Sequence, residues 1–349
     1  MKRNLLDRHS IQLFANSIWL GPLGAIIAWY SDVPVPFLIG PTVLCSLAAW
    51  LGLKFAVPNL VKNLAFIIIG LTLGSNVTPD TLALASKWPV SLICMSASVF
   101  TITIFGQYFL NYFFFMDKNS SVLASSPGHL SFVLSISNEI NGETAKISVI
   151  QSTRVLILTL ITPLMIFYFG PNSVSNNIFL VSPSIPLFEL VVLIFISASV
   201  GLLINKTKIP APFLISGMIC STFSNGTGLT HGEVPINLTL FAFVIIGTLI
   251  GSRFVSVNLS LLRASFVGGV LLTFMSTFLA VLFAYITYRI TDINFMESII
   301  AFAPGGLETM IAMGTLVNAD PTYIAIHHVS RIFLLSFLVP LLIHKENQV

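Results

Sequence analysis

Stretches of about 20 apolar residues follow one another along almost the whole chain, from near Ile11 to Ile343. Each stretch is long enough to cross the ~30 Å hydrocarbon core of a bilayer as an α-helix. Charged residues make up only 8% of the 349 residues, against roughly 25% in soluble globular domains. The short alternating segments that build a transmembrane β-barrel are absent. The sequence therefore predicts an all-α polytopic membrane protein.

This composition excludes several classes of function. No stretch between the apolar segments is long enough for a water-soluble catalytic or DNA-binding domain. The net charge of +3 comes from scattered residues, so no nucleic-acid partner is expected. The cysteines lie far apart in apolar runs without metal-ligand spacing, and we expect packing residues: Cys45, Cys94 and Cys220. We predict neither an enzyme nor a cofactor.

The chain contains an internal duplication at an offset of 177 residues. Seven of the twelve residues of Leu64–Ser75 are identical to those of Phe241–Ser252. The same offset relates further pairs, namely Pro127 with Pro304, Arg154 with Arg331, and Pro163 with Pro340. A single offset kept over this length predicts duplicated architecture. The predicted repeats are residues 1–175 and 176–349.

Each repeat contains six apolar segments. They cover 11–30, 33–53, 60–77, 88–115, 120–138 and 147–169 in the first repeat, and 185–204, 209–225, 236–252, 264–288, 296–317 and 322–343 in the second. The fifth segment of each repeat has a Pro-Gly pair near its middle, Pro127-Gly128 and Pro304-Gly305. Proline and glycine interrupt helices. Each fifth segment is therefore a re-entrant hairpin, a broken spanning helix or a kinked helix, and recurrence in both repeats favours an interruption over a simple kink.

The distribution of Lys and Arg separates these alternatives, because cytoplasmic loops are enriched in both residues. If both fifth segments span, the repeats are parallel and the two sides hold eight and six basic residues. If both re-enter, the repeats are inverted, and twelve basic residues face the cytoplasm against two outside. We therefore predict two inverted repeats of five transmembrane helices in a bacterial inner membrane, with cytoplasmic termini. A reporter fused after Ser175 is expected to be active in the periplasm.

Two arginines follow the Pro-Gly pairs at the same spacing, Arg154 and Arg331. An arginine at lipid depth is costly and usually faces a cavity or a partner. Half-helices that begin at the breaks would add partial positive charge at the same depth, which is a common plan of transporter sites. The predicted solute site consists of Pro127, Gly128, Arg154, Pro304, Gly305, Gly306, Glu308, His328 and Arg331. Alternatively, each arginine caps carbonyls of the broken helix or pairs with Glu308.

Other polar and small residues allow two interpretations each. Glu308 and His328 could carry a coupling proton or be ordinary polar residues of a cavity. The adjacent His327 and His328 do not form a convincing metal site, because no third ligand has suitable spacing. The Gly-x-x-x-Gly runs, 70–74 and 247–251, favour close helix packing over lining a permeation path.

The run Ala301–Glu308 with its Pro-Gly-Gly, then His327-His328-Val-Ser-Arg331, resembles the AbrB-type membrane protein family, as does the partial copy Ser126–Leu130 with Arg154. The resemblance extends over the chain and implies a duplicated fold related to cation/proton antiporters and anion transporters. Family members are also called transcriptional regulators. The leading hypothesis is a transporter of a small, anionic or zwitterionic solute in the lipid bilayer. A membrane-embedded regulator of gene expression is the alternative, and homo-oligomerisation stays open.

Overall fold

The structure is a computed structural model, and it describes residues 8–75, 88–128, 130–140, 142–169, 184–207, 211–230, 232–255, 257, 259–291, 293–316 and 319–343. The predicted reporter position, Ser175, lies outside these residues. In the described part of the chain, Ser184 and Glu233 form an isolated β-bridge, which is not part of a sheet. Six helices within these described residues are long and apolar enough to cross a membrane. The prediction of an all-α chain with such helices is confirmed.

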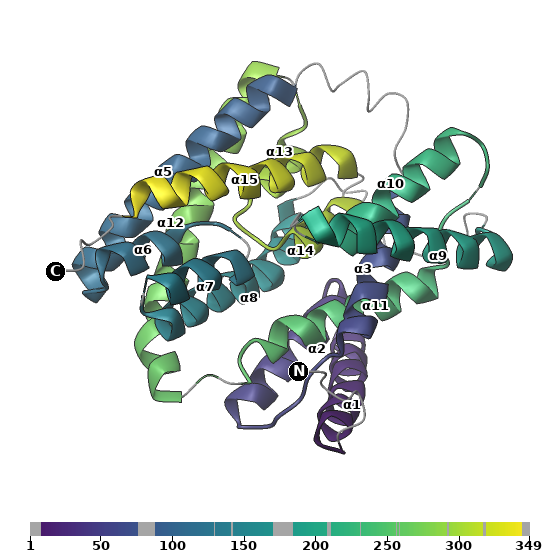
Figure 1. Ribbon diagram of the computed structural model, residues 1–349, viewed down its shortest axis with the longest axis horizontal. Coiled ribbons are helices and arrows are strands. Elements are labelled where there is room, and N and C mark those ends of the chain that lie inside the picture. The colour runs from purple at the N-terminus through teal and green to yellow at the C-terminus, as the bar shows by residue number, and fades with distance from the viewer. Residues whose placement is uncertain are drawn as a thin grey trace. The chain divides into compact units, whose positions relative to one another are not determined.

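The helices follow the predicted apolar segments closely (Figure 1). They are α1 (Arg8–Tyr30), α2 (Pro36–Trp50), α3 (Asn59–Gly74), α5 (Trp88–Phe114), α6 (Lys118–Ser125), α7 (Leu130–Glu139), α8 (Thr144–Phe169), α9 (Leu187–Ile204), α10 (Pro212–Gly226), α11 (Ile236–Ser252), α12 (Leu259–Thr291), α13 (Phe295–Phe302), α14 (Leu307–Leu316) and α15 (Pro321–Leu342), with a short 3₁₀ turn η3 (Asn205–Thr207). Proline stands at the first position of α2 and of α10, where its missing N–H costs no hydrogen bond.

Large apolar side chains cover much of the exposed surface of these helices. Trp19 is 78% exposed, Phe188 is 79% exposed and Phe195 is 74% exposed. Many exposed large apolar side chains are rare on water-soluble proteins, whereas the hydrocarbon core of a bilayer accommodates them without cost. The exposed side chains therefore agree with helices that face a bilayer.

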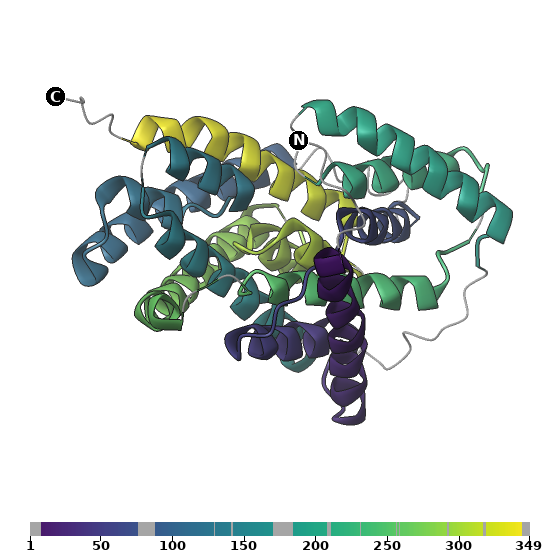
Figure 2. The same cartoon turned by 60° about the horizontal axis from the view of Figure 1, so that its bottom comes forward.

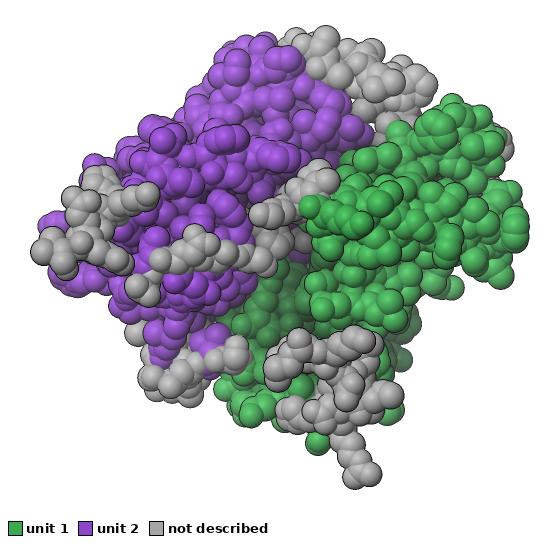
Figure 3. All heavy atoms as spheres, viewed as in Figure 1, with its two compact units in different colours: residues 1–78, 159–256 green, residues 79–158, 257–349 purple. Residues whose placement is uncertain are grey.

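The chain forms two compact units, and each unit combines segments from both predicted repeats (Figure 3). Unit 1 consists of residues 1–78 and 159–256, and unit 2 consists of residues 79–158 and 257–349. The units group segments that are close in space, whereas the predicted boundary at residue 175 concerns the duplication of the sequence. The division into 1–175 and 176–349 therefore stays a prediction.

Unit 1 is held together by helices whose backbones approach closely. Helices α1 and α2 lie side by side (dark purple, Figures 1 and 2). A Cβ added to Gly217 of α10 would lie 2.6 Å from the Ile67 carbonyl oxygen of α3, and one added to Gly247 of α11 would lie 2.6 Å from the Leu38 carbonyl oxygen of α2. Because a methyl group does not fit at such distances, glycine is required there. Among the described contacts, the Gly-x-x-x-Gly runs serve helix packing.

Unit 2 contains both Pro-Gly pairs and both arginines. The long helices α5 and α12 pack against each other, and α13 packs against α12 and α15. Helix α15 also contacts α5, α6 and α14. The elements that carry the predicted site residues therefore belong to one compact unit.

Candidate functional site

The two Pro-Gly pairs lie where a helix stops and another begins. Helix α6 ends at Ser125 and α7 begins at Leu130, while α13 ends at Phe302 and α14 begins at Leu307. The residue before each proline has left the helical conformation, with ψ of 122° at Ser126 and 130° at Ala303. A proline disfavours the α conformation of its predecessor, so the sequence accounts for both interruptions.

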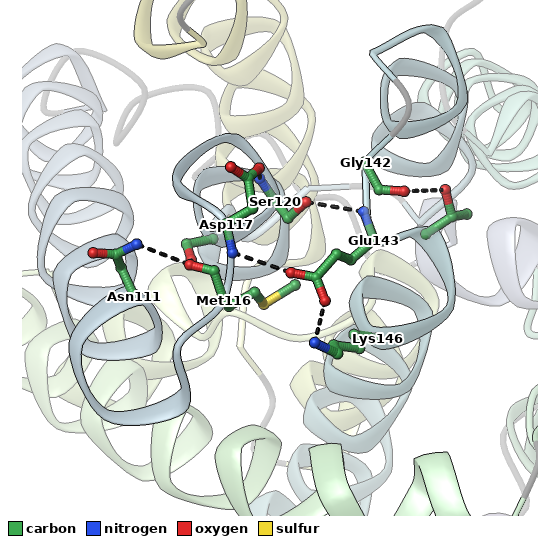
Figure 4. Close-up of polar contacts among 9 residues, drawn as sticks. Asn111, Met116, Asp117, Ser120, Gly142, Glu143 and Lys146 are labelled. Carbon is green, nitrogen blue, oxygen red and sulfur yellow. Dashed lines mark hydrogen bonds and ion pairs between the residues drawn. The ribbon is translucent and has the colours of Figure 1, made fainter.

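Each interrupted segment returns to the place where it began, so it forms a hairpin. In the first, the backbone N–H of Glu143, just before α8, donates to Ser120 Oγ at 2.9 Å in the first turn of α6 (Figure 4). In the second, the backbone N–H of Asp320, just before α15, donates to Glu297 Oε1 at 3.2 Å in the first turn of α13. The two donor residues, Glu143 and Asp320, are 177 residues apart in the sequence, and so are the two acceptor residues, Ser120 and Glu297. The two hairpins are therefore closed by equivalent bonds.

Side chains also cap the first helix of each hairpin. Asp117 Oδ2 accepts from the Ser120 N–H at 3.0 Å, and Asn294 Oδ1 accepts from the Met296 N–H at 2.9 Å. These caps satisfy backbone donors that a helix N-terminus leaves free. The start of each hairpin is therefore held by its own cap and by the closing bond.

We expect Asp117→Ala to lower the free energy of unfolding by about 1 kcal/mol, because it removes the cap of α6. Asp117→Asn is the matched control, since asparagine is the residue at the equivalent position of the second hairpin. Thermal unfolding of both variants in detergent measures the difference. Equal stability of Asp117→Ala and wild type would contradict a role for this cap.

Arg154 and Gln151 of α8 bind the carbonyl groups at the end of α6. Arg154 Nη1 donates to Ser126 O at 3.3 Å, and Nη2 donates to Gln151 Oε1 at 2.5 Å. The Gln151 amide donates to Leu123 O and Ser126 O, both at 2.9 Å. Both side chains are buried. Carbonyls that have lost their helical N–H partners at the break are thus satisfied by side chains.

Arg331 and His328 of α15 do the same at the end of α13. Arg331 Nη1 donates to Ala303 O at 2.6 Å, and Nη2 donates to Gly305 O at 2.9 Å. Nη2 also lies 2.9 Å from His328 Nδ1, while His328 Nε2 lies 3.0 Å from Ile300 O. Since guanidinium only donates and a carbonyl only accepts, we assign His328 as the neutral tautomer with its proton on Nε2.

The two clusters correspond residue by residue at the offset of 177. Arg154 and Gln151 are equivalent to Arg331 and His328, and the Ser126 and Ala303 carbonyls that they bind are equivalent too. These contacts of the two arginines are those of the capping alternative, and no described carboxylate lies within ion-pair distance of Arg331. The Nε–H of Arg331 is buried and has no hydrogen-bond partner among the described residues. A donor of this kind is available to a bound anion.

The remaining predicted site residues lie at or beside the breaks. Pro127 is buried, and Gly128 is close enough to α15 that a Cβ would lie 3.3 Å from Leu335 Cδ1. Pro304 lies between the carbonyl acceptors of Arg331, and the Gly306 carbonyl accepts from the Met310 N–H at 3.0 Å. The side chain of Glu308 and the whole of His129 lie outside the described residues. Unit 2 therefore brings the first break against the helix that carries Arg331.

Sequence reasoning left several members of this arrangement out of the predicted site. Gln151 is equivalent to His328, and Ser120, Glu143, Glu297 and Asp320 close the hairpins. The offset of 177 relates all of them in pairs. The signal was therefore present, but the pairs differ in residue type, which hid their common role.

Where the structure describes the chain, it is helical and has six apolar helices of membrane-spanning length, which is the architecture of a polytopic membrane protein. Residues 37–345 match the family model described as "Transition state regulatory protein AbrB", and the chain belongs to this AbrB family. It is 25% identical to "Uncharacterized protein YhjN" of Bacillus subtilis, over 93% of this chain and 90% of that protein. It is 26% identical to "Putative regulator AbrB" of Escherichia coli, over 86% of this chain and 87% of that protein.

Proposed function

We propose that the chain is a secondary transporter of a small anionic or zwitterionic solute in a bacterial inner membrane. In this proposal the two hairpins re-enter the bilayer, the repeats are inverted five-helix bundles, and both termini are cytoplasmic. We assign no enzymatic reaction, cofactor or nucleic-acid partner. The lipid bilayer and the solute are the partners.

The closure of each hairpin supports re-entry. A segment that starts and ends at one place, as Ser120 with Glu143 and Glu297 with Asp320 do, leaves the membrane on the side it entered. Five crossings then remain in each repeat, and an odd number inverts the second repeat relative to the first. The distribution of basic residues agrees with this topology.

The buried guanidinium of Arg331 carries the proposal. It lies at the carbonyl end of α13 and beside the residues that precede α14. Its Nη atoms hold the break in place, and its Nε–H has no partner among the described residues. Broken helices that meet a buried charge are the usual construction of solute sites in transporters with repeats.

A membrane-embedded regulator without transport is the second candidate, and the name "Putative regulator AbrB" of the Escherichia coli relative favours it. Such a protein would affect gene expression through a partner. Uptake into liposomes that contain only the purified chain separates the two candidates, because a regulator without transport gives none.

The test measures uptake of radiolabelled acetate, lactate, succinate, glutamate and glycine by proteoliposomes under a proton or sodium gradient. We expect one of these probes to accumulate, and Arg331→Lys to lower its initial rate at least tenfold while the protein stays folded. The exposed Arg289→Lys variant is the matched control and should keep the wild-type rate. Absence of uptake for all probes under both gradients would contradict the proposal and favour the regulator.

The proposed topology has its own test. A reporter fused after Ser175 should be active in the periplasm, and a single cysteine placed at Lys146 should react only with reagents added from the cytoplasmic side. Labelling of that cysteine from the outside would contradict inversion of the repeats, whatever the result of the uptake measurement.

A further inference from the structure

The bases of the two hairpins differ in charge although they are built alike. In the first, Glu143 pairs with Lys146 and accepts from the Asp117 N–H at 3.1 Å (Figure 4). The residues 177 positions after Glu143 and Lys146 are Asp320 and Tyr323. The second hairpin thus keeps the carboxylate before the long helix but has no ammonium group at the equivalent position.

A second carboxylate has been added at the base of the second hairpin. Glu297 replaces Ser120 as the acceptor for the closing N–H, and it brings its charge next to Asp320. Neither Glu297 nor Asp320 forms a salt bridge in the described part of the chain. The first base has two carboxylates and two lysines, Asp117, Glu143, Lys118 and Lys146. The second has Glu297 and Asp320, and no cation of the described residues lies within ion-pair distance of either.

Buried oxygen atoms without hydrogen-bond partners surround this pair of carboxylates. Among the described residues they are Ser298 Oγ and the Tyr323 hydroxyl, whereas Asp320 Oδ2 and Thr322 Oγ1 lie beside each other. Ser298 is 0% exposed and Tyr323 is 1% exposed. The Tyr323 hydroxyl lies beside the hydroxyls of Ser91 and Ser298 and feels the charge of Glu297, yet it forms no hydrogen bond of ordinary geometry. Buried polar atoms normally have partners, so these point to a ligand.

The chemistry of these oxygens selects the ligand. One oxygen of each carboxylate is already used, because Glu297 Oε1 accepts from Asp320 N and Asp320 Oδ1 accepts from Thr322 N at 2.8 Å. The second carboxylate oxygen of each residue remains, that of Asp320 lying beside Thr322 and the Tyr323 N–H. Together with neutral hydroxyls these oxygens are a set of hard ligands. No group of three or more His, Cys, Asp or Glu suited to a metal ion occurs among the described residues. Such a set suits a hard cation better than a transition metal, and the single charge of the Lys146 ammonium at the equivalent place of the first hairpin favours a monovalent one.

We propose that the base of the second hairpin binds a monovalent cation of the size of Na⁺ through Glu297, Asp320, Ser298 and Tyr323. The cation takes the part that the ammonium of Lys146 plays in the first hairpin. It ties the start of α13 to the start of α15 and thereby holds the hairpin closed. Binding at this place goes beyond the proposed transport function and does not depend on it.

Protons compete with the cation for the same carboxylates. Burial raises the pKa of Glu297 and of Asp320 above their usual values, and the charge of Asp320 raises that of Glu297 further. A raised pKa means that the folded state holds more protons, so without a bound cation stability is greatest at low pH and is lost as the pH rises through the folded-state pKa values. The other titratable groups near the pair are Tyr323, Cys94 and, behind Ser91, His327.

The test compares thermal unfolding of the purified full chain in detergent at pH 8 in NaCl and in choline chloride of equal concentration. We expect NaCl to raise Tm by about 4 °C at 100 times the dissociation constant, and the rise to shrink at pH 5. Glu297→Gln and Asp320→Asn should remove the response. Glu143→Gln is the matched control from the first hairpin and should keep it.

Two substitutions at Tyr323 sharpen the test. Tyr323→Lys places an ammonium where the first hairpin has one, so its Tm should no longer depend on Na⁺. Tyr323→Phe removes only an unpaired hydroxyl, so it should fold normally and require about tenfold more Na⁺ for half of the effect. Equal Tm of the wild type in NaCl and choline chloride at pH 8 would overturn the proposal. Neither measurement uses a transported solute, so a failure to observe uptake would leave the proposed cation site unaffected.

Discussion

Replacing Arg331 with alanine should lower the free energy of unfolding by about 3 kcal/mol, because it leaves the buried carbonyls of Ala303 and Gly305 without donors. The His328 ring also loses the partner of its Nδ1 atom. These acceptors lie at the break between α13 and α14, where water does not replace the lost bonds since Arg331 is only 3% exposed. Thermal unfolding in detergent should show Tm lower by roughly 6 °C.

His328→Gln is the matched control for this effect. Glutamine is the residue of the first cluster, where Gln151 accepts from Arg154 and donates to the Leu123 carbonyl. A glutamine at position 328 can accept from Arg331 and donate to Ile300 in the same way, so its stability should stay within about 1 kcal/mol of the wild type. Arg331→Ala with an unchanged Tm would show that the arginine does not hold the break.

Substitution of Gly247 by alanine should be the second largest effect. Its Cβ would lie 2.6 Å from the Leu38 carbonyl oxygen and 3.0 Å from Pro41 Cβ of the neighbouring helix. Backbone atoms do not move aside as the end of a flexible side chain does, so α11 and α2 must separate. We expect a loss of about 3 kcal/mol, at the upper end of the usual cost of overpacking, measured by thermal unfolding in detergent.

Gly226→Ala is the matched control, because nothing lies within 4 Å of a Cβ at that position near the end of α10. There the substitution should be neutral or stabilising by up to about 1 kcal/mol, since alanine has the higher helix propensity. If Gly247→Ala and Gly226→Ala had the same stability, the close approach of α11 to α2 would be contradicted.

Much of the fold could be predicted from local features of the sequence. The segment predicted at 236–252 is α11, Ile236–Ser252, and the segment predicted at 88–115 is α5, Trp88–Phe114. Apolar length sets where such helices begin and end, because the bilayer has a fixed thickness. The breaks could be predicted as well, since proline acts on its own backbone and on the residue before it. Both are effects of short range along the chain.

The candidate site was only partly predictable. Arg154 and Arg331 stand out because charge is rare in this chain, but their partners are backbone carbonyls, which every residue carries. Gln151, Glu297 and Asp320 are ordinary polar residues in the sequence, and their roles became visible only when α8 and α15 were placed beside the hairpins. The grouping of the helices into two compact units was not predicted, because each unit combines segments far apart in the chain.

The sequence by itself determined the membrane class, the offset of the duplication, the helix positions and the two interruptions, because hydrophobic length and proline chemistry act locally. The tertiary structure alone decided which carbonyls the arginines satisfy and which residues close each hairpin. It also decided that the second hairpin gathers two carboxylates that form no salt bridge with any residue the structure describes. These contacts join residues more than 20 positions apart, and their geometry exists only once the helices have packed.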